Sequence, residues 1–479
     1  MNDVSKVRAG VVVLAVAIVA ACTVGPEYRR PQVVSVDEFV GAGGSRFDND
    51  EIEREFWRAF DDPLLNRLIE EGLRSNHDIA IAMARLREAR ALRGGARLDL
   101  APTVTERAAR VESRASERQV PFPGADRDQD YYETSFDAFW ELDFFGRARR
   151  GVEAATAEVQ AAEANVYGTQ VIITAEIARN YFELRGAQKR LAVARRNAEN
   201  QRESLRLTQA RLAAGHGTQL DVSRAQAQLE TTLGSIPDIE AEVNKTMLRL
   251  AVLIGREPQA LVAELSVPKD LPLLPQTHSI GTPEALLRRR PDVIAAERQL
   301  AAATARIGIA VADLFPRIAL VGFWGFDANA TGALGDSSSE TYTFGPSIQW
   351  AAFDLGRVRQ RIAQREAASD AALSRYEQTV LHALEETDAS LTNYAKALVK
   401  REHLSRSAAA SMGAAHIARV RFENGAVDFL TVLDAERSAL QVEDALARSE
   451  TQTATTLLAM YKALGGGFRP LERTARHDR

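Results

Sequence analysis

The sequence predicts a mainly helical protein with a smaller β component, built twice from one plan. One phrase around a glycine recurs, as RLAAGHGTQLDVSRAQ at 211–226 and RFENGAVDFLTVLDAE at 421–436. Two very long stretches rich in Ala, Glu, Gln, Arg and Leu have the apolar spacing of helices. Before each of them lie stretches in which apolar and polar residues alternate, which is typical of β-strands.

The composition excludes several classes of function. The chain has 479 residues, a formal net charge of -5 and 46% hydrophobic residues, as expected of one to three folded domains. Lys and Arg are interspersed with Asp and Glu along helical stretches, which argues against nucleic acid as a partner. The seven His residues occur singly, without metal-ligand spacing, so we expect no enzyme activity, no cofactor and no metal site.

The N-terminus has the pattern of an export signal. Basic residues precede an apolar run at 9–21, which is too short to span a bilayer. The run ends in VAAC, which resembles a bacterial lipobox, although Val19 stands where Leu is usual. Acylation of Cys22, the only cysteine, would anchor the mature chain in a membrane. The alternative is a chance cleavage site that leaves a free thiol. Thr23, in place of Asp, favours the outer membrane.

An internal duplication relates the two halves of the chain. An offset of 210 aligns Trp140 with Trp350 and the phrase at 211–226 with that at 421–436. Further upstream the offset is 214, which aligns Pro102 with Pro316. The first repeat is therefore longer between its Pro and its Trp, where we expect an exposed loop.

Each repeat is expected to contain a helix, a β-hairpin and two long helices joined by a glycine turn. At 1.5 Å per residue, the first long helix would extend about 100 Å, and its many Ala residues favour close packing. The expected parts are a signal peptide (1–21), an N-terminal lipid-anchored segment (22–60), a first repeat (61–265), a linker (266–283), a second repeat (284–465) and a tail (466–479). The expected hairpins span about 103–143 and 317–354, and the expected long helices span 147–214, 218–254, 357–424 and 428–464.

The hairpin stretches alternate between an aromatic and a polar face. In the first repeat Tyr132, Phe136 and Trp140 share one face, with Glu133 and Asp137 on the other. Strands of this kind suit an outer-membrane barrel or a soluble sheet with one buried face, and the lipobox favours the barrel. Four strands leave open edges in hydrocarbon, so several chains must share one barrel. Counting strands leaves dimer, trimer and tetramer open.

Longer motifs resemble one family. They are CTVGPEYRRP, ELDFFGRARR, LLRRRPDVIAAERQLAAATARIGIAVADLFPRIAL, the phrase around Asn424-Gly425, and YKALGGGF. They resemble the TolC family of outer-membrane factors, in its NodT/OprM-type lipoprotein branch, over nearly all of the mature chain. The resemblance implies the outer membrane efflux protein fold, a homotrimer whose twelve-stranded β-barrel, with four strands per chain, continues into a twelve-helix periplasmic α-barrel with an equatorial belt.

The same resemblance implies a function. It is the exit duct of a tripartite efflux pump, which passively conducts small toxic compounds or drugs across the outer membrane. The implied partners are a periplasmic adaptor (membrane fusion) protein, an inner-membrane RND transporter and outer-membrane lipid. Two alternatives stay open, namely the duct of a type I protein secretion system and a structural coiled-coil lipoprotein of the envelope.

Both glycine phrases are expected at helix reversals, at the end of the rods opposite the barrel. Gly215 and Gly425 would supply the positive-φ residue of each turn. Arg211 and Arg421 lie one turn earlier, where the helix dipole favours a cation. Together with Asp428, these residues are candidates for the turns that dock the adaptor.

Carboxylates near these turns are candidates for a gate. Asp434 matches the family's aperture carboxylate, and three copies would form an acidic ring, although an Asp early in a helix also favours the dipole. Asp221 matches a family position in the tip network, whereas Thr431 replaces an Asp of some members. We expect Arg224 or Arg437 to pair with a tip carboxylate in the closed state.

Overall fold

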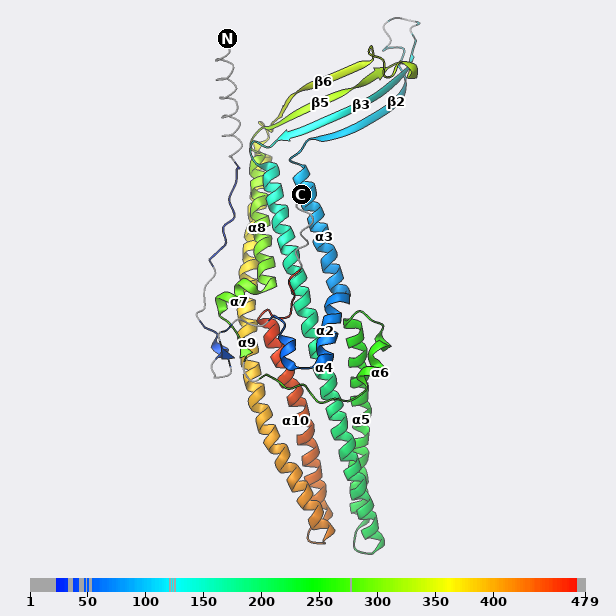
Figure 1. The fold of residues 1–479 in the computed structure, drawn as a ribbon, viewed down its shortest axis with the longest axis vertical. Coiled ribbons are helices and arrows are strands. Elements are labelled where there is room, and N and C mark those ends of the chain that lie inside the picture. The colour runs from blue at the N-terminus through cyan, green and yellow to red at the C-terminus, as the bar shows by residue number, and fades with distance from the viewer. Residues whose placement is uncertain are drawn as a thin grey trace. The chain divides into compact units, whose positions relative to one another are not determined.

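A computed structural model describes residues 23–32, 38–42, 47–48, 50, 54–119, 122, 124, 126–275 and 278–471 (Figure 1). The expected signal peptide at 1–21, Cys22 and the last part of the expected tail, 472–479, lie outside the described residues. The chain divides into two compact units. Unit 1 contains the described residues of Met1–Gln32, Arg85–Glu163 and Ala295–Glu377, and unit 2 those of Val33–Ala84, Ala164–Ile294 and Gln378–Arg479. The compact units therefore do not coincide with the sequence repeats, because each unit packs parts of both repeats together.

The helices account for most of the described chain. The α-helices are α2 (Pro63–Ser75), α3 (His77–Leu98), α4 (Arg147–Ala213), α5 (Gln219–Leu253), α6 (Val262–Leu265), α7 (Pro283–Arg289), α8 (Pro291–Ala312), α9 (Leu355–Glu423) and α10 (Phe429–Ala463). Short 3-10 helices are η1 (Val40–Ala42), η2 (Phe56–Phe60), η3 (Pro258–Leu261) and η4 (Thr331–Ala333). The ends of the four long helices, α4, α5, α9 and α10, lie within two residues of the ends expected from the sequence. Among the described residues, none of the helices combines the length and the hydropathy needed to cross a bilayer.

Unit 1 contains an antiparallel sheet of four strands. They are β2 (Thr103–Arg114), β3 (Asp128–Leu142), β5 (Arg317–Ala328) and β6 (Glu340–Gln349), and this is also their order in the sheet. Each repeat supplies one hairpin, and β3 pairs with β5 to join the two. A short parallel pair, β1 (Phe47–Asp48) with β4 (His278–Ser279), lies in unit 2.

Aromatic residues collect on one face of the four-stranded sheet. Phe136 and Trp324 lie opposite each other in the register, with ring centroids 6.3 Å apart and the rings nearly parallel. On β6, Phe344 is 69% exposed. Strand β2 departs from this pattern, because Glu106 lies opposite Phe136 and Arg110 opposite Tyr132 on the same face.

Aromatic residues also contribute to the core of unit 2, which is otherwise mainly aliphatic. Trp57 of η2 is fully buried, and its neighbour Phe56 stacks on Tyr461 of α10 with a centroid distance of 4.8 Å. The first residues of the expected tail pack nearby, since Arg469 forms an ion pair with Glu55. The N-terminal segment and the end of the second repeat are thereby held together.

Candidate gate at the helix tips

Both helix reversals close with the same backbone hydrogen bonds. In the first, Gly215 N donates to Leu212 O over 3.0 Å and His216 N to Arg211 O over 2.9 Å. The second turn repeats both bonds around Gly425. The φ angles of Gly215 and Gly425 are +76° and +72°, in the left-handed region that closes such turns and favours glycine.

The helices that follow the turns begin with different caps. Thr218 Oγ1 accepts from Asp221 N over 3.2 Å, and Asp221 Oδ2 accepts in return from Thr218 N, so Asp221 has a local role as part of a capping box. Asp428 caps α10, where its Oδ1 accepts from Thr431 N over 3.0 Å and from Thr431 Oγ1 over 2.6 Å. The hydrogen bonds from Thr431 hold the pKa of Asp428 below its usual range, and the charge of Arg224 lowers it further.

Arg211 ties the first tip to the second. Its Nη1 donates to Phe422 O over 2.6 Å, and its guanidinium lies over the Phe422 ring, 4.5 Å from the centroid. Phe422 in turn packs against Phe429, across the turn from α9 to α10, in a buried cluster with Val432 and Leu433. Arg211, which is expected at the adaptor-docking turns, therefore also joins the two repeats.

Asp434 lies on a groove formed by α9 and α10. The same groove is lined by Arg421 and Asp428, together with Ile417 and Leu430. Both of these apolar side chains are about half exposed, at 58% and 49%. The structure thus brings three of the expected tip residues together beside an apolar surface.

The two arginines expected to pair with a tip carboxylate have different surroundings. Arg224 influences Asp428 through its charge. Arg437 donates from Nε to the amide oxygen of Gln228 over 3.4 Å, and both line another groove with Arg190 and Asp444.

A buried carboxylate that the sequence analysis did not single out lies two residues beyond Asp434. Glu436 is only 6% exposed. Its Oε1 accepts from Ser204 Oγ over 2.9 Å and from Arg419 Nη2 over 2.6 Å, so it joins α10 to both α4 and α9. The sequence feature that could have identified Glu436 is its spacing. Glu436, Glu443 and Glu450 follow each other at seven-residue intervals on one side of α10.

These glutamates belong to a longer contact, which we call the α4–α10 seam. It pairs Lys189 with Glu450, Arg190 with Asp444, Arg196 and Asn197 with Glu443, and Ser204 with Glu436. The helices also approach closely beyond Lys189. A Cβ on Gly186 would lie 2.0 Å from Thr451 Oγ1, so a larger residue there would push the helices apart. The seam is both polar and tight.

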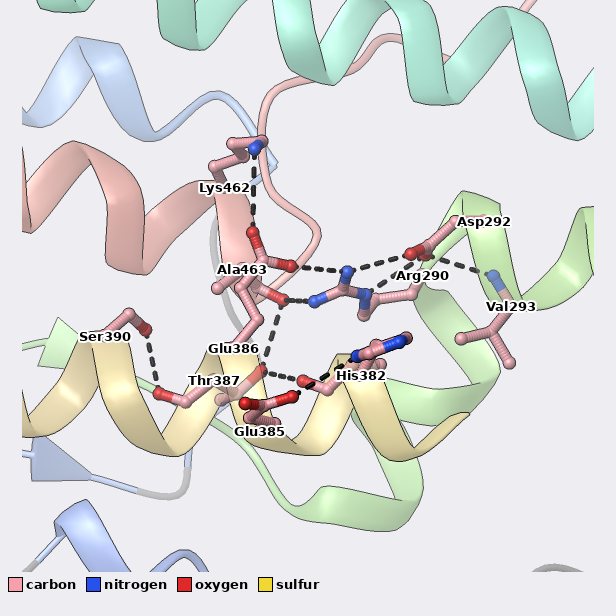
Figure 2. A network of polar contacts seen from close by, with 11 residues as sticks. Arg290, Asp292, Val293, His382, Glu385, Glu386, Thr387, Ser390, Lys462 and Ala463 are labelled. Carbon is pink, nitrogen blue, oxygen red and sulfur yellow. Dashed lines mark hydrogen bonds and ion pairs between the residues drawn. The ribbon is translucent and has the colours of Figure 1, made fainter. Parts of the chain in front are cut away.

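Arg290 holds the C-terminal end of α10 (Figure 2). Its Nη1 donates to Ala463 O over 2.8 Å, and its Nη2 donates to Asp292 over 2.8 Å and to Glu386 of α9 over 2.7 Å. Glu386 also forms an ion pair with Lys462. The junction between α7 and α8 is thus fastened to both α9 and α10.

The first repeat contains the equivalent contact without the charges. Asn76 Nδ2 donates to Leu253 O over 2.8 Å. The offset of 214 makes Asn76 equivalent to Arg290, and the offset of 210 makes Leu253 equivalent to Ala463. The duplication therefore extends to individual hydrogen bonds, and the second repeat has added ionic links to α9.

Comparison with known proteins agrees with this duplicated architecture. The family model described as outer membrane efflux protein matches residues 68–256 and 282–466, with its gap between the repeats. The outer membrane protein OprJ of Pseudomonas aeruginosa is 31% identical over 470 residues, which cover 96% of each chain. Nodulation protein T of Rhizobium leguminosarum bv. trifolii is 28% identical over 462 residues, or 95% of this chain and 97% of that protein. The solved structure of the outer-membrane channel OprN matches with a TM-score of 0.87 and 44% identity, over 93% of this chain and 99% of that one. The chain belongs to the outer membrane efflux protein family.

Proposed function

We propose that three copies of this chain form the exit duct of a tripartite efflux pump in the outer membrane. The observation that carries this proposal is the four-stranded sheet, whose edge strands β2 and β6 have no neighbour beyond them in the described sheet. In hydrocarbon each unpaired backbone group costs several kcal/mol. Pairing β2 of one copy with β6 of the next removes both edges. Three copies give twelve strands, enough for a channel, whereas the eight strands of two copies would be filled by side chains.

The aromatic face of the sheet is proposed to contact lipid. Two indoles at equivalent positions mark one boundary of this face. Trp140 Nε1 donates to Leu100 O and Trp350 Nε1 donates to Leu314 O, each over 3.0 Å. Aromatic rings whose polar atom is satisfied are favoured where hydrocarbon meets water. The two residues therefore indicate the same membrane boundary in both hairpins.

Acylation of Cys22 is supported by the way in which the next residues are held. Val24 N donates to Phe145 O over 3.2 Å, and Arg150 Nε donates to Val24 O over 3.2 Å. A Cβ on Gly25 would lie 2.5 Å from Gly308 Cα, so this segment crosses α8 closely. These contacts place the segment beside the junction of β3 and α4. Acyl chains on Cys22 would then enter the same membrane as the sheet.

The duct is proposed to act without chemistry of its own and to work with a periplasmic adaptor and an inner-membrane RND transporter. The turns at Gly215 and Gly425, with the groove beside Arg421 and Asp428, are the proposed docking region. The names of relatives mention different exported compounds. They are pyoverdine for OpmQ and toluene for TtgI, both of Pseudomonas putida, and cations for CusC of Escherichia coli. One architecture with several cargoes supports a passive duct, and small toxic compounds are the proposed cargo here.

Two neighbouring residues of β6 test the proposed orientation. Phe344 lies on the aromatic face and Thr343 on the opposite face. We expect Phe344→Lys to prevent formation of the heat-modifiable trimer, since a lysine in lipid costs about 2–4 kcal/mol near the bilayer midplane. We expect Thr343→Lys to assemble normally and to shift the ion selectivity of the channel in planar bilayers towards anions. Equal behaviour of the two variants would contradict the orientation, and a soluble, non-conducting monomer of the mature protein would refute the duct.

A further inference from the structure

The C-terminal part of α3 carries an excess of positive charge. From residue 85 to residue 98 it contains five arginines and a single acidic residue, Glu88. The arginines are Arg85, Arg87, Arg90, Arg93 and Arg97. Within the described part of the chain, none of them has a carboxylate within ion-pair distance. A charge excess of this kind attracts an oppositely charged partner.

The equivalent helix of the second repeat, α8, lacks these charges. The offset of 214 places three uncharged residues at the positions of Arg90, Arg93 and Arg97, namely Thr304, Ile307 and Val311. Both arginines that α8 contains are paired, Arg298 with Glu297 and Arg306 with Glu158. The helix that both repeats share therefore does not require the arginines of α3, which indicates a role specific to the first repeat.

The surroundings of α3 are open at the level of these arginines. Arg90, Arg93 and Arg97 follow each other three and four residues apart, so they share one side of the helix. Arg90 and Arg97 are exposed, and Arg93 is half-buried. A Cβ added at Gly94 or Gly95 would meet no described atom within 4 Å. A large partner can therefore approach this part of α3.

The C-terminal end of α3 lies at the boundary of the aromatic face of the sheet. Trp140, which belongs to that face, donates from its indole to Leu100 O over 3.0 Å. At about 1.5 Å per residue, Arg97 lies about 5 Å and Arg93 about 10 Å from Leu100 along the chain. The headgroup layer beside the hydrocarbon of a bilayer is about 5–8 Å thick. The flexible stem of an arginine can extend its guanidinium into this layer.

We propose that Arg93 and Arg97 bind anionic phospholipid headgroups in the leaflet nearest the helices. This inference rests on the proposed duct, which places the sheet in a membrane. The phosphate of a headgroup offers a guanidinium two oxygens in the geometry of a bidentate contact. Each arginine near an anionic surface contributes on the order of fivefold in lipid affinity. Together with Trp140 at the boundary, the two charges fix the depth of the sheet in the bilayer.

Quenching of Trp140 fluorescence by brominated lipid tests this contact on the full protein in vesicles. Replacing Trp324 and Trp350 by Phe leaves Trp140 as the tryptophan that meets lipid, because Trp57 is fully buried. The vesicles contain phosphatidylcholine and phosphatidylglycerol, and one of the two is brominated in each experiment. We expect Trp140 to prefer phosphatidylglycerol by on the order of tenfold or more, and 1 M salt to weaken this preference.

Two double variants of α3 in the same background locate the contact. Arg93→Gln with Arg97→Gln is expected to lower the preference for phosphatidylglycerol to near unity. Arg85→Gln with Arg87→Gln is the matched control, because it removes the same charge from the same helix. These two residues lie about 20 Å from Leu100, beyond the screening length of about 8 Å, so their loss should leave the preference unchanged.

The outcomes separate this inference from the proposed duct. If brominated phosphatidylcholine quenches Trp140 but both double variants keep the same lipid preference, the lipid contact is wrong and the duct remains. If neither brominated lipid quenches Trp140, the sheet is not embedded in a bilayer and the duct fails as well. If Arg93→Gln with Arg97→Gln changes the ion selectivity in planar bilayers but not the lipid preference, the arginines face the bore and the inference is overturned.

Discussion

Ser204 of α4 donates to Glu436 of α10 over 2.9 Å, although the two residues are 232 positions apart. Arg419 of α9 binds the same carboxylate oxygen. One buried carboxylate therefore joins the ends of three long helices near the tips. This carboxylate links the two helix tips within one chain.

Glu436→Ala is expected to loosen the tips. Removal of the carboxylate leaves Arg419 without its buried partner, which should cost about 2–3 kcal/mol of local stability. Hydrogen exchange of the backbone amides at 414–436 measures the effect. Glu199→Ala is the control, because the Glu199–Arg202 pair is exposed and contributes little. Equal acceleration of exchange in both variants would show that Glu436 has no special role.

Gly186→Ala is expected to destabilise the α4–α10 seam by about 1–3 kcal/mol, because the new Cβ would overlap Thr451. Gly168→Ala in the same helix meets its nearest neighbour at 3.7 Å, an ordinary contact. That variant should be neutral or stabilising by up to about 1 kcal/mol, as alanine favours helix. The temperature at which the detergent-extracted protein dissociates compares the two variants. A dissociation temperature of Gly186→Ala equal to that of the wild-type protein would argue against close contact between α4 and α10.

Arg290→Met is expected to destabilise the end of α10. The loss should be on the order of 2 kcal/mol, less than for a fully buried pair, because Asp292 and Glu386 are about half exposed. Arg290→Asn copies the first repeat and retains a donor for Ala463 O, so its loss should be smaller. Limited proteolysis of the segment that follows Ala463, at the C-terminal end of α10, measures both losses. A larger loss for Arg290→Asn than for Arg290→Met would exclude the carbonyl contact as the main contribution.

The stability of the fold is expected to depend on the protonation of Asp292. Burial raises its pKa, but the hydrogen bond and charge of Arg290 outweigh burial and hold the pKa below its usual value. Because the folded pKa is the lower one, Asp292 stabilises the fold above the unfolded pKa of about 3.9, and this contribution is lost as the pH falls through the folded value. Between about pH 5 and about pH 3, the melting temperature should therefore fall more steeply for the wild-type protein than for Asp292→Asn.

Asp434→Asn tests the acidic ring. Loss of one charge from each copy should reduce cation selectivity in planar bilayers. Asp428→Asn is the matched control, because that carboxylate is engaged as the cap of α10 and asparagine caps a helix equally well, so the turn should be kept and selectivity should change less. If Asp434→Ala and Arg224→Ala channels both keep the wild-type conductance and selectivity, the proposed gate is wrong.

Local patterns were sufficient to predict much of this fold. Helix α4 follows from apolar spacing and from the absence of proline between Gly146 and Ala214, and the turns after α4 and α9 follow from glycines that adopt positive φ. The alternation in β3, β5 and β6 predicted the hairpins and their aromatic face. These features depend on neighbours within a few residues, so they can be predicted from the sequence alone. Strand β2 shows the limit, because its Glu106 and Arg110 lie on the aromatic face.

The roles of the tip carboxylates depended on tertiary structure. Asp221, Asp428, Asp434 and Glu436 are all acidic residues near a helix start, yet two cap helices, one lines a groove and one is buried against α4. Sequence spacing shows which side of a helix a residue occupies, but the helix that covers this side is far away in the chain. Burial and ionic pairing arise only when α4, α9 and α10 come together, and for this reason the seam could be found only in the folded protein.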